Sequence, residues 1–159
     1  KIELCRLIME RFENIDAIAG VATGAIAQGA LIAEQLGLPY VYVRSAPKDH
    51  GLENLIEGNL IPGQRVVVIE DLISTGGSSL KAVEAIRNVG CEVVGMAAIF
   101  SYRFPVAEER FKPAKVDVVT LSNYEAVLEA ALQTGYITDG DLETLKEWRK
   151  DPASWNAGK

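Results

Sequence analysis

Two adjacent carboxylates follow a run of β-branched residues in the middle of the chain. Residues 66–79 read VVVIEDLISTGGSS, so Glu70 and Asp71 come at the end of a strand that we expect to be buried on both faces. The turn that follows is rich in glycine and hydroxyl groups, and it leads into a predicted helix that begins at Gly77. Backbone N–H groups that converge at such a helix N-terminus favour a phosphate.

The two carboxylates would repel that phosphate, but they can accept hydrogen bonds from sugar hydroxyls or meet the water shell of a divalent cation. A phosphate cradle beside sugar-binding acids predicts a site for a phosphorylated ribose. The segment lacks the Gly-x4-Gly-Lys-Ser/Thr pattern of a P-loop, and its glycines do not have the spacing of a dinucleotide-binding site. The alternative is a capped helix start that binds nothing.

A second segment, residues 44–58, carries cations. Residues 45–58 show no clear helix or strand period, and loops of roughly this length inside compact domains are usually lids or binding loops. The segment contains Arg44, Lys48 and His50, which is the chain's one histidine. Cations on a movable loop would neutralise a pyrophosphate while closure of the loop excludes water. The alternative is a solvated polar turn with an incidental histidine.

Strands alternate with helices along the chain. We expect strands at 17–21, 40–44, 65–70, 92–100 and 116–121, and helices at 24–36, 77–88, 105–112, 122–132 and 141–150, after an N-terminal helical segment that ends near Phe12. Ser122 and Glu125 stand at capping-box spacing at the start of the helix that ends at Leu132. The alternation predicts an α/β fold with a mostly parallel sheet covered on both faces. Ligands of such sheets lie at the carboxyl ends of the strands, here the loops after Val21, Arg44 and Asp71.

Segment 66–79 resembles the phosphoribosyl diphosphate (PRPP) signature of the type I phosphoribosyltransferases. Residues 42–58, YVRSAPKDHGLENLIEG, are similar to the mobile catalytic loop of the orotate phosphoribosyltransferases, with its Lys-Asp-His-Gly run followed by Asn-x-Ile-Glu-Gly. The resemblance covers essentially the whole chain. It implies a single phosphoribosyltransferase domain over residues 1–159, a mobile loop at about 44–58, and the absence of the N-terminal hood segment that precedes Lys1 in the family.

The resemblance implies transfer of 5-phosphoribosyl from PRPP to orotate, which gives orotidine 5′-phosphate and pyrophosphate in pyrimidine biosynthesis. Lys48, His50 and Asp71 would be catalytic. The PRPP-binding residues would be Thr23, Gly24, Arg44, Lys48, His50, Glu70, Asp71, Leu72, Ile73, Ser74, Thr75, Gly76, Gly77 and Ser78. Within this set, Glu70 and Asp71 would hold the ribose hydroxyls, and the stretch 74–78 would hold the 5′-phosphate.

By the same resemblance Ser74 would also lie close to orotate, and Arg103 would either meet the orotate carboxylate or be an ordinary surface arginine. Mg2+ is the implied cofactor. It would be held mainly through PRPP, near Glu70 and Asp71, and we assign no direct protein ligand to it. The family also shares the catalytic loop across subunits, which implies a homodimer. Two departures from some relatives, Gly24 in place of a lysine and Ser45 in place of a basic residue, leave fewer cations for the leaving group.

Composition narrows the possible partners. The chain has 159 residues and a formal net charge of −6, which argues against a nucleic-acid partner. The uncharged stretch 17–33 is interrupted by glycines and is too short to span a membrane. The two cysteines, Cys5 and Cys91, suit buried free thiols of a cytoplasmic protein. The alternatives to the orotate enzyme are a purine or uracil phosphoribosyltransferase and a PRPP-sensing regulator without catalysis.

Overall fold

The computed structural model describes residues 1–44, 46 and 55–155. Their elements follow one another in the order α1 (Ile2–Arg11), β1 (Ala17–Val21), α2 (Ile26–Leu36), β2 (Tyr40–Val43), β3 (Ile56–Glu57), β4 (Arg65–Ile73), α3 (Gly77–Asn88), β5 (Glu92–Ser101), α4 (Pro105–Phe111), β6 (Val118–Asn123), α5 (Tyr124–Gln133) and α6 (Asp139–Lys150). The strands form one six-stranded sheet in the order β3-β2-β1-β4-β5-β6. All neighbouring strands are parallel except the short β3, which pairs antiparallel with β2. The predicted mostly parallel α/β fold is confirmed.

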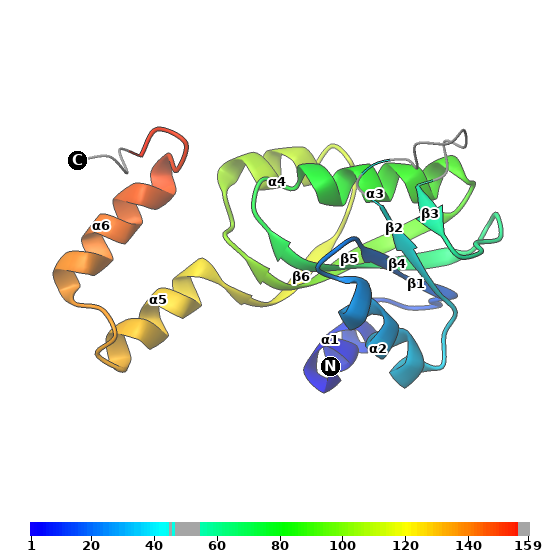
Figure 1. Cartoon of the computed structure of the whole chain (residues 1–159), viewed down its shortest axis with the longest axis horizontal. Helices are drawn as coiled ribbons and strands as arrows, with labels where there is room; N and C mark the ends of the chain where they lie inside the picture. The colour runs from blue at the N-terminus through cyan, green and yellow to red at the C-terminus, as the bar shows by residue number, and fades with distance from the viewer. Residues whose placement is uncertain (45, 47–54, 156–159) are drawn as a thin grey trace.

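Helices cover both faces of this sheet, with α1 and α2 on one side and α3 and α4 on the other (Figure 1). The valine-rich start of β4 shows why the sheet lies between two helical layers. Val66 and Val68 pack into the core beneath α3 and α4, whereas Val67 and Ile69 pack into the core beneath α1 and α2. All four side chains are fully buried. The continuous apolar run therefore forms a central strand without a polar face, as predicted.

Strand β4 continues three residues beyond its predicted end at Glu70. Leu72 and Ile73 pair with Phe100 and Ser101 of β5, so the ladder includes both acids of the signature and the two residues after them. The turn into α3 is consequently confined to residues 74–76. The segment predicted to have no helix or strand period contains the short strand β3 in its described part. This strand forms because Ile56 and Glu57 pair with Val43 and Tyr42 of β2.

Several helix starts differ from their predicted positions. Helix α2 begins at Ile26 rather than Gly24, since residues 22–25 form a turn after β1. Helix α5 is capped by Asn123, whose side-chain oxygen accepts a hydrogen bond from the N–H of Ala126, so the predicted Ser122–Glu125 capping box is wrong. Ser122 is instead part of β6. A capping box does occur at α6, where Thr138 and Asp141 satisfy each other's backbone N–H groups.

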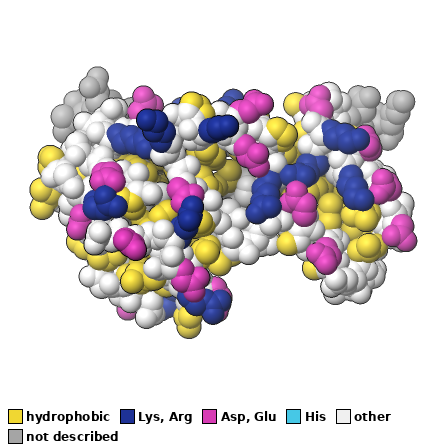
Figure 2. All heavy atoms as spheres, turned by 180° about the vertical axis from the view of Figure 1, so that it is seen from behind, with side chains coloured by type: hydrophobic (Ala, Val, Ile, Leu, Met, Phe, Trp, Pro, Cys, Tyr) yellow, Lys and Arg dark blue, Asp and Glu magenta, His cyan; other side chains and the backbone are white. Residues whose placement is uncertain are grey.

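The C-terminal helices α5 and α6 lie to one side of the sheet, beyond β6 (Figure 1). Seen from behind, basic and acidic side chains intermingle where this helix pair adjoins the body of the molecule (Figure 2). Both cysteines are buried free thiols, as predicted. In the described part of the chain, no helix is both long and apolar enough to cross a membrane.

Candidate active site

The carboxyl ends of three adjacent strands meet at one edge of the sheet. β1 lies between β2 and β4, so the three loops that the sequence singled out leave the sheet side by side. The loop after β1 comes close to Asp71 of the signature. A methyl group added at Gly24 would lie 1.9 Å from Oδ2 of Asp71 and 2.4 Å from its Cγ. The structure therefore brings Gly24 and Asp71 together, and it has no room for a side chain at position 24 while Asp71 stays in place.

Glu70 is the buried member of the acidic pair, with 4% of its surface exposed. The hydroxyl of Ser79, in the first turn of α3, donates a 2.8 Å hydrogen bond to Oε2 of Glu70. Burial raises the pKa of Glu70 to about 7, although the Ser79 hydrogen bond acts in the opposite direction. A buried carboxylate with one oxygen satisfied can use its other oxygen to accept a hydrogen bond from a ligand hydroxyl.

Asp71 is more exposed than Glu70. Its Oδ1 accepts a 2.8 Å hydrogen bond from the N–H of Leu72, which fixes the carboxylate close to the backbone. Its Oδ2 is the atom that faces Gly24. The two acids of the signature thus have different surroundings, one buried against α3 and one at the mouth of the loop after β1.

The turn from β4 into α3 offers free donors. Gly76 is the N-cap residue of α3, and within residues 1–44, 46 and 55–155 no side chain caps the first N–H groups of the helix. Those groups and the helix dipole favour an anion. Ser74 is half-buried, and Thr75 and Ser78 are exposed, so the predicted phosphate-binding residues surround this helix start.

Helix α4 supports the same turn from outside. Arg110 donates a 2.9 Å hydrogen bond to the carbonyl oxygen of Thr75. Gly76 has a φ of 74°, and a methyl group added to it would lie 2.8 Å from the ring of Phe111. Glycine is therefore required at position 76 both by the left-handed backbone and by the close approach of α4.

The loop after β1 is supported by Tyr40. The hydroxyl of Tyr40 donates a 2.7 Å hydrogen bond to the carbonyl oxygen of Ile26, at the start of α2. Its side chain fills the space over Gly20 and Gly29, where an added methyl group would lie 2.7 Å and 2.8 Å from Tyr40 atoms. Burial raises the pKa of Tyr40 to about 12, so its phenol stays protonated and continues to donate. Two glycines and one tyrosine thus fix the path of the loop that carries Thr23 and Gly24.

Of the predicted catalytic loop, residues 44, 46 and 55–58 are described. Arg44 follows β2, and a terminal nitrogen of its guanidinium lies 3.5 Å from Oε1 of Glu57 in β3. Lys48 and His50, together with Ser45, lie outside the described residues. Their predicted roles stay predictions.

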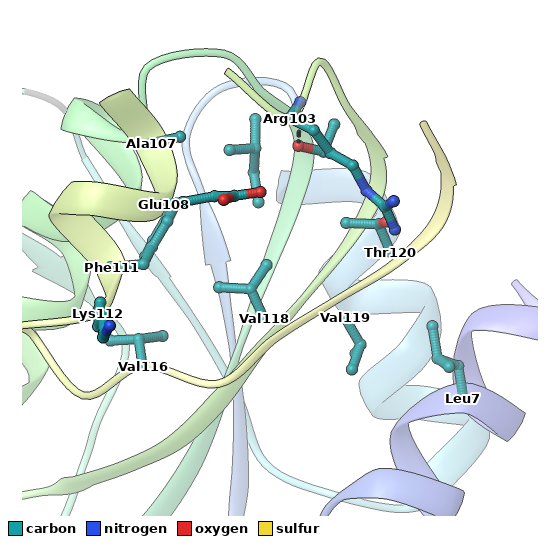
Figure 3. A pocket seen from close by; sticks show the side chains of 12 residues that line it. Leu7, Arg103, Ala107, Glu108, Phe111, Lys112, Val116, Val118, Val119 and Thr120 are labelled. Carbon is teal, nitrogen blue, oxygen red and sulfur yellow. Dashed lines mark hydrogen bonds between the residues drawn. The ribbon is translucent and has the colours of Figure 1, made fainter. Parts of the chain in front are cut away.

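A cavity of about 600 Å3 opens between the ends of β4 and β5, helix α4 and the edge strand β6. Ile73 and Ser101, which are paired in the sheet, contribute to its lining beside Arg103. The side chain of Arg103 points along the cavity toward Thr120 of β6 (Figure 3). In the described part of the chain the guanidinium of Arg103 has no hydrogen-bond or ion-pair partner, and its backbone N–H donates to Oγ of Ser101.

Three supporting residues were missed from the sequence. Ser79 stands beside the predicted phosphate-binding serines, and the need of a buried carboxylate for a donor in the next helix turn was the signal that could have found it. Arg110 and Tyr40 gave no such signal, because their partners are backbone carbonyl oxygens that only the fold brings near. Among the described residues, no three histidine, cysteine, aspartate or glutamate side chains are grouped as a metal site.

Comparison with known proteins agrees with this geometry. The family model of the phosphoribosyl transferase domain matches residues 2–134, and the chain belongs to this family. A protein of Bacteroides thetaiotaomicron named orotate phosphoribosyltransferase is 73% identical over 159 residues, which are 100% of this chain and 75% of that protein. The resemblance stated from the two motifs is confirmed.

Solved structures give the same result for the fold. The crystal structure of orotate phosphoribosyltransferase from Aeropyrum pernix matches with a TM-score of 0.72 and 29% identity, over 86% of this chain and 77% of that one. The adenine phosphoribosyltransferase of Thermoanaerobacter pseudethanolicus matches with a TM-score of 0.62 and 25% identity, over 77% and 79% of the two chains. One fold therefore serves different bases, and base choice depends on local residues.

Proposed function

We propose that this chain transfers the 5-phosphoribosyl group of PRPP to N1 of orotate, as part of pyrimidine biosynthesis. In this reaction the bond from C1 of the ribose to the pyrophosphate oxygen breaks and a bond from C1 to N1 of orotate forms. The products are orotidine 5′-phosphate and pyrophosphate, and the proton of N1 is released. The observation that carries the proposal is the meeting of Asp71 with the loop after β1, beside the uncapped start of α3.

Each part of PRPP then has a counterpart at the sheet edge. The 5′-phosphate accepts hydrogen bonds from the N–H groups at the start of α3 and from the hydroxyls of the turn before it. Glu70 and Asp71 accept hydrogen bonds from the ribose hydroxyls. The pyrophosphate lies on the loop at Thr23 and Gly24, with Arg44 at its border and with Lys48 and His50 closing over it.

Catalysis in this arrangement is mainly electrostatic. The breaking bond leaves positive charge on the ribose and gathers negative charge on the pyrophosphate. Fixed backbone N–H groups and cations stabilise the leaving group, and loss of one good donor in such a site typically costs on the order of 10²–10³ in rate. The carboxylates near the ribose hold it in line for attack by the base.

Mg2+ is part of the proposal, since the residues present fit a metal that arrives with its substrate. Mg2+ prefers oxygen ligands and commonly uses one or two carboxylates together with substrate phosphates. Asp71 is the carboxylate at the mouth of the pyrophosphate loop, and Glu70 is its neighbour. The metal would neutralise charge on the pyrophosphate, while the residues of this chain hold and orient the ribose.

Recognition of orotate is proposed to involve Ser74 and Arg103. Orotate is an anion, and Arg103 lines the cavity beside the ends of β4 and β5 with a guanidinium that has no partner in the described residues. Arginine is suited to bind a carboxylate with two hydrogen bonds. Ser74 is half-buried and directly follows Ile73, which lines this cavity.

The assembly is proposed to be a homodimer in which the loop at 44–58 completes the site of the neighbouring subunit. The test mixes Lys48→Ala subunits with Asp71→Ala subunits. Recovered activity on mixing supports a shared site, and inactive heterodimers of proven composition contradict it. A cytoplasmic location is proposed because both cysteines are free thiols, which suits a reducing compartment.

The decisive experiment is release of pyrophosphate from PRPP with orotate and Mg2+. We expect release with orotate and none with uracil, adenine or hypoxanthine, or when Mg2+ is removed by a chelator. Release with a purine or with uracil, and not with orotate, would support a purine or uracil phosphoribosyltransferase. Binding of PRPP by calorimetry without any release would favour the PRPP-sensing regulator.

A further inference from the structure

The loop between β5 and α4 holds Arg103 in an unusual backbone conformation. Arg103 has a φ of 51°, in the left-handed region that residues with side chains rarely adopt. Two hydrogen bonds tie the loop to the sheet, from the N–H of Arg103 to Oγ of Ser101 (3.0 Å) and from the N–H of Tyr102 to the carbonyl oxygen of Ile73 (3.0 Å). Such a conformation persists only where the surroundings impose it.

Arg149, in the last turn of α6, donates hydrogen bonds to two carbonyl oxygens of this loop. Its Nε donates to the carbonyl oxygen of Tyr102 at 3.0 Å, and a terminal nitrogen donates to the carbonyl oxygen of Arg103 at 2.8 Å. The remaining terminal nitrogen pairs with Glu125 of α5 at 2.7 Å. One guanidinium therefore joins two consecutive carbonyl groups of the loop to an anchor on the neighbouring helix.

An aromatic cluster fixes α6 at the same place. Tyr102 and Phe104 stack with their ring centroids 5.0 Å apart, on either side of Arg103 in the sequence. Trp148, the residue before Arg149, meets both rings edge-on at 5.8 Å and 5.9 Å. Tyr124 of α5 completes the cluster at 5.4 Å from Trp148. The residues on both sides of Arg103 are thus bound to α6, while its own side chain extends to the cavity (Figure 3).

We propose that α6 is a positioning element for base recognition, in which Arg149 sets the backbone of Arg103 and so aims its guanidinium into the orotate cavity. The family model matches residues 2–134, and α6 begins at Asp139. The proposed role therefore belongs to a helix that the family model does not include. The inference rests on the proposed function, which gives Arg103 the orotate carboxylate. Arg149 itself touches no substrate in this scheme.

The first test compares Arg149→Gln with Lys146→Gln. Both changes remove one positive charge from α6, but Lys146 is exposed and its described ion pair is with Glu143 of its own helix. We expect Arg149→Gln to raise the KM for orotate roughly tenfold, the size of one lost charged hydrogen bond, with the KM for PRPP within about twofold of the wild type. Lys146→Gln should match the wild type in both. An unchanged KM for orotate in Arg149→Gln overturns the inference, and so does an equal rise in both KM values.

The second test asks whether Arg149 acts through Arg103. In a double-mutant cycle, Arg149→Gln should raise the KM for orotate in the wild-type background and leave it unchanged in an Arg103→Ala background. Independent, additive effects would show a general structural role and overturn the inference. If Arg149→Gln fails to fold, Glu125→Gln, which loses only the anchor of Arg149, takes its place in the cycle with a smaller expected rise.

The outcomes separate this inference from the function on which it rests. A wild-type chain without orotate-dependent release of pyrophosphate contradicts the proposed function, and the positioning role falls with it. An active wild-type chain with an orotate KM that is insensitive to Arg149 contradicts the positioning role alone.

Discussion

The hydroxyl of Ser79 lies 2.8 Å from Oε2 of Glu70, so a hydrogen bond joins the first turn of α3 to β4 across the turn at residues 74–76. Both residues are buried, with 1% and 4% of their surfaces exposed. This hydrogen bond joins the two ends of the turn, and in the proposed function Glu70 accepts a hydrogen bond from the ribose. It is therefore a contact that should hold the proposed PRPP site in shape.

Removal of that hydroxyl should weaken PRPP binding. Ser79→Ala leaves Glu70 without its donor, and a hydrogen bond to a charged group is worth about 1.5–3 kcal/mol. We expect the KM for PRPP to rise by about tenfold or more, with a smaller change in kcat, in steady-state assays of pyrophosphate release. Thr144→Ala removes a hydroxyl that donates to the carbonyl oxygen of Gly140 within α6, and it should leave the KM for PRPP unchanged. Equal values for the two variants would refute this role of Ser79.

The buried carboxyl of Glu70 should make stability depend on pH. Because burial raises its pKa from 4.5 to about 7, the folded chain keeps a proton between these values that the unfolded chain has released. The free energy of unfolding should therefore fall as the pH rises from 5 to 8, by up to roughly 3 kcal/mol from this group. Urea titrations at pH 5 and pH 8 measure this difference in the free energy of unfolding. Glu70→Gln should lose the part of the difference that comes from Glu70.

Glu84→Gln provides the matched control for the Glu70 experiment, since Glu84 is exposed on α3. It should retain the wild-type difference between pH 5 and pH 8. A Glu70→Gln variant that loses as much stability over this range as the wild type would contradict the assignment.

A methyl group at position 24 should impair catalysis without unfolding the protein. In Gly24→Ala the new Cβ meets the carboxylate of Asp71, which can swing away at little cost to the fold but then leaves its ligand position. We expect kcat/KM for PRPP to fall by about 10²-fold, since small displacements of positioning groups have effects of this size. Gly140→Ala, whose added methyl group lies no closer than 3.8 Å to a neighbour, should retain wild-type activity. Thermal unfolding should show both variants folded.

Lys48 carries a prediction that comes from the sequence motif, because it lies outside the described residues. Lys48→Ala should reduce turnover by on the order of 10²–10³, as expected for one lost donor to the leaving group. The circular dichroism spectrum and thermal midpoint should stay those of the wild type. Lys81→Ala, an exposed change on α3, should be fully active. Near-normal turnover of Lys48→Ala would remove this residue from the mechanism.

Much of the fold could be predicted from local pattern. The apolar run at 66–69 could only be a strand buried on both faces, and its alternation with helical segments led to the parallel sheet. The exact end of β4 could not be predicted, because Leu72 and Ile73 are held in the strand by β5, a partner distant in sequence. The cap of α5 was misplaced by one residue for a similar reason, since Ser122 is drawn into the sheet edge and Asn123 takes over the capping bond.

The residue pattern alone was enough to predict which chemical groups would meet the substrate: two acids, a glycine-rich turn and a cationic loop, in an order typical of phosphoribosyl transfer. How these groups are held depends on the folded chain. Gly24 against Asp71, Ser79 on Glu70, Arg110 on Thr75 and Arg149 on the loop of Arg103 are contacts between elements that folding brings together. The residue pattern of a segment indicates which helix, strand or turn it can form. The supporting contacts depend on how whole strands and helices are placed relative to one another, which the pattern of one segment does not determine.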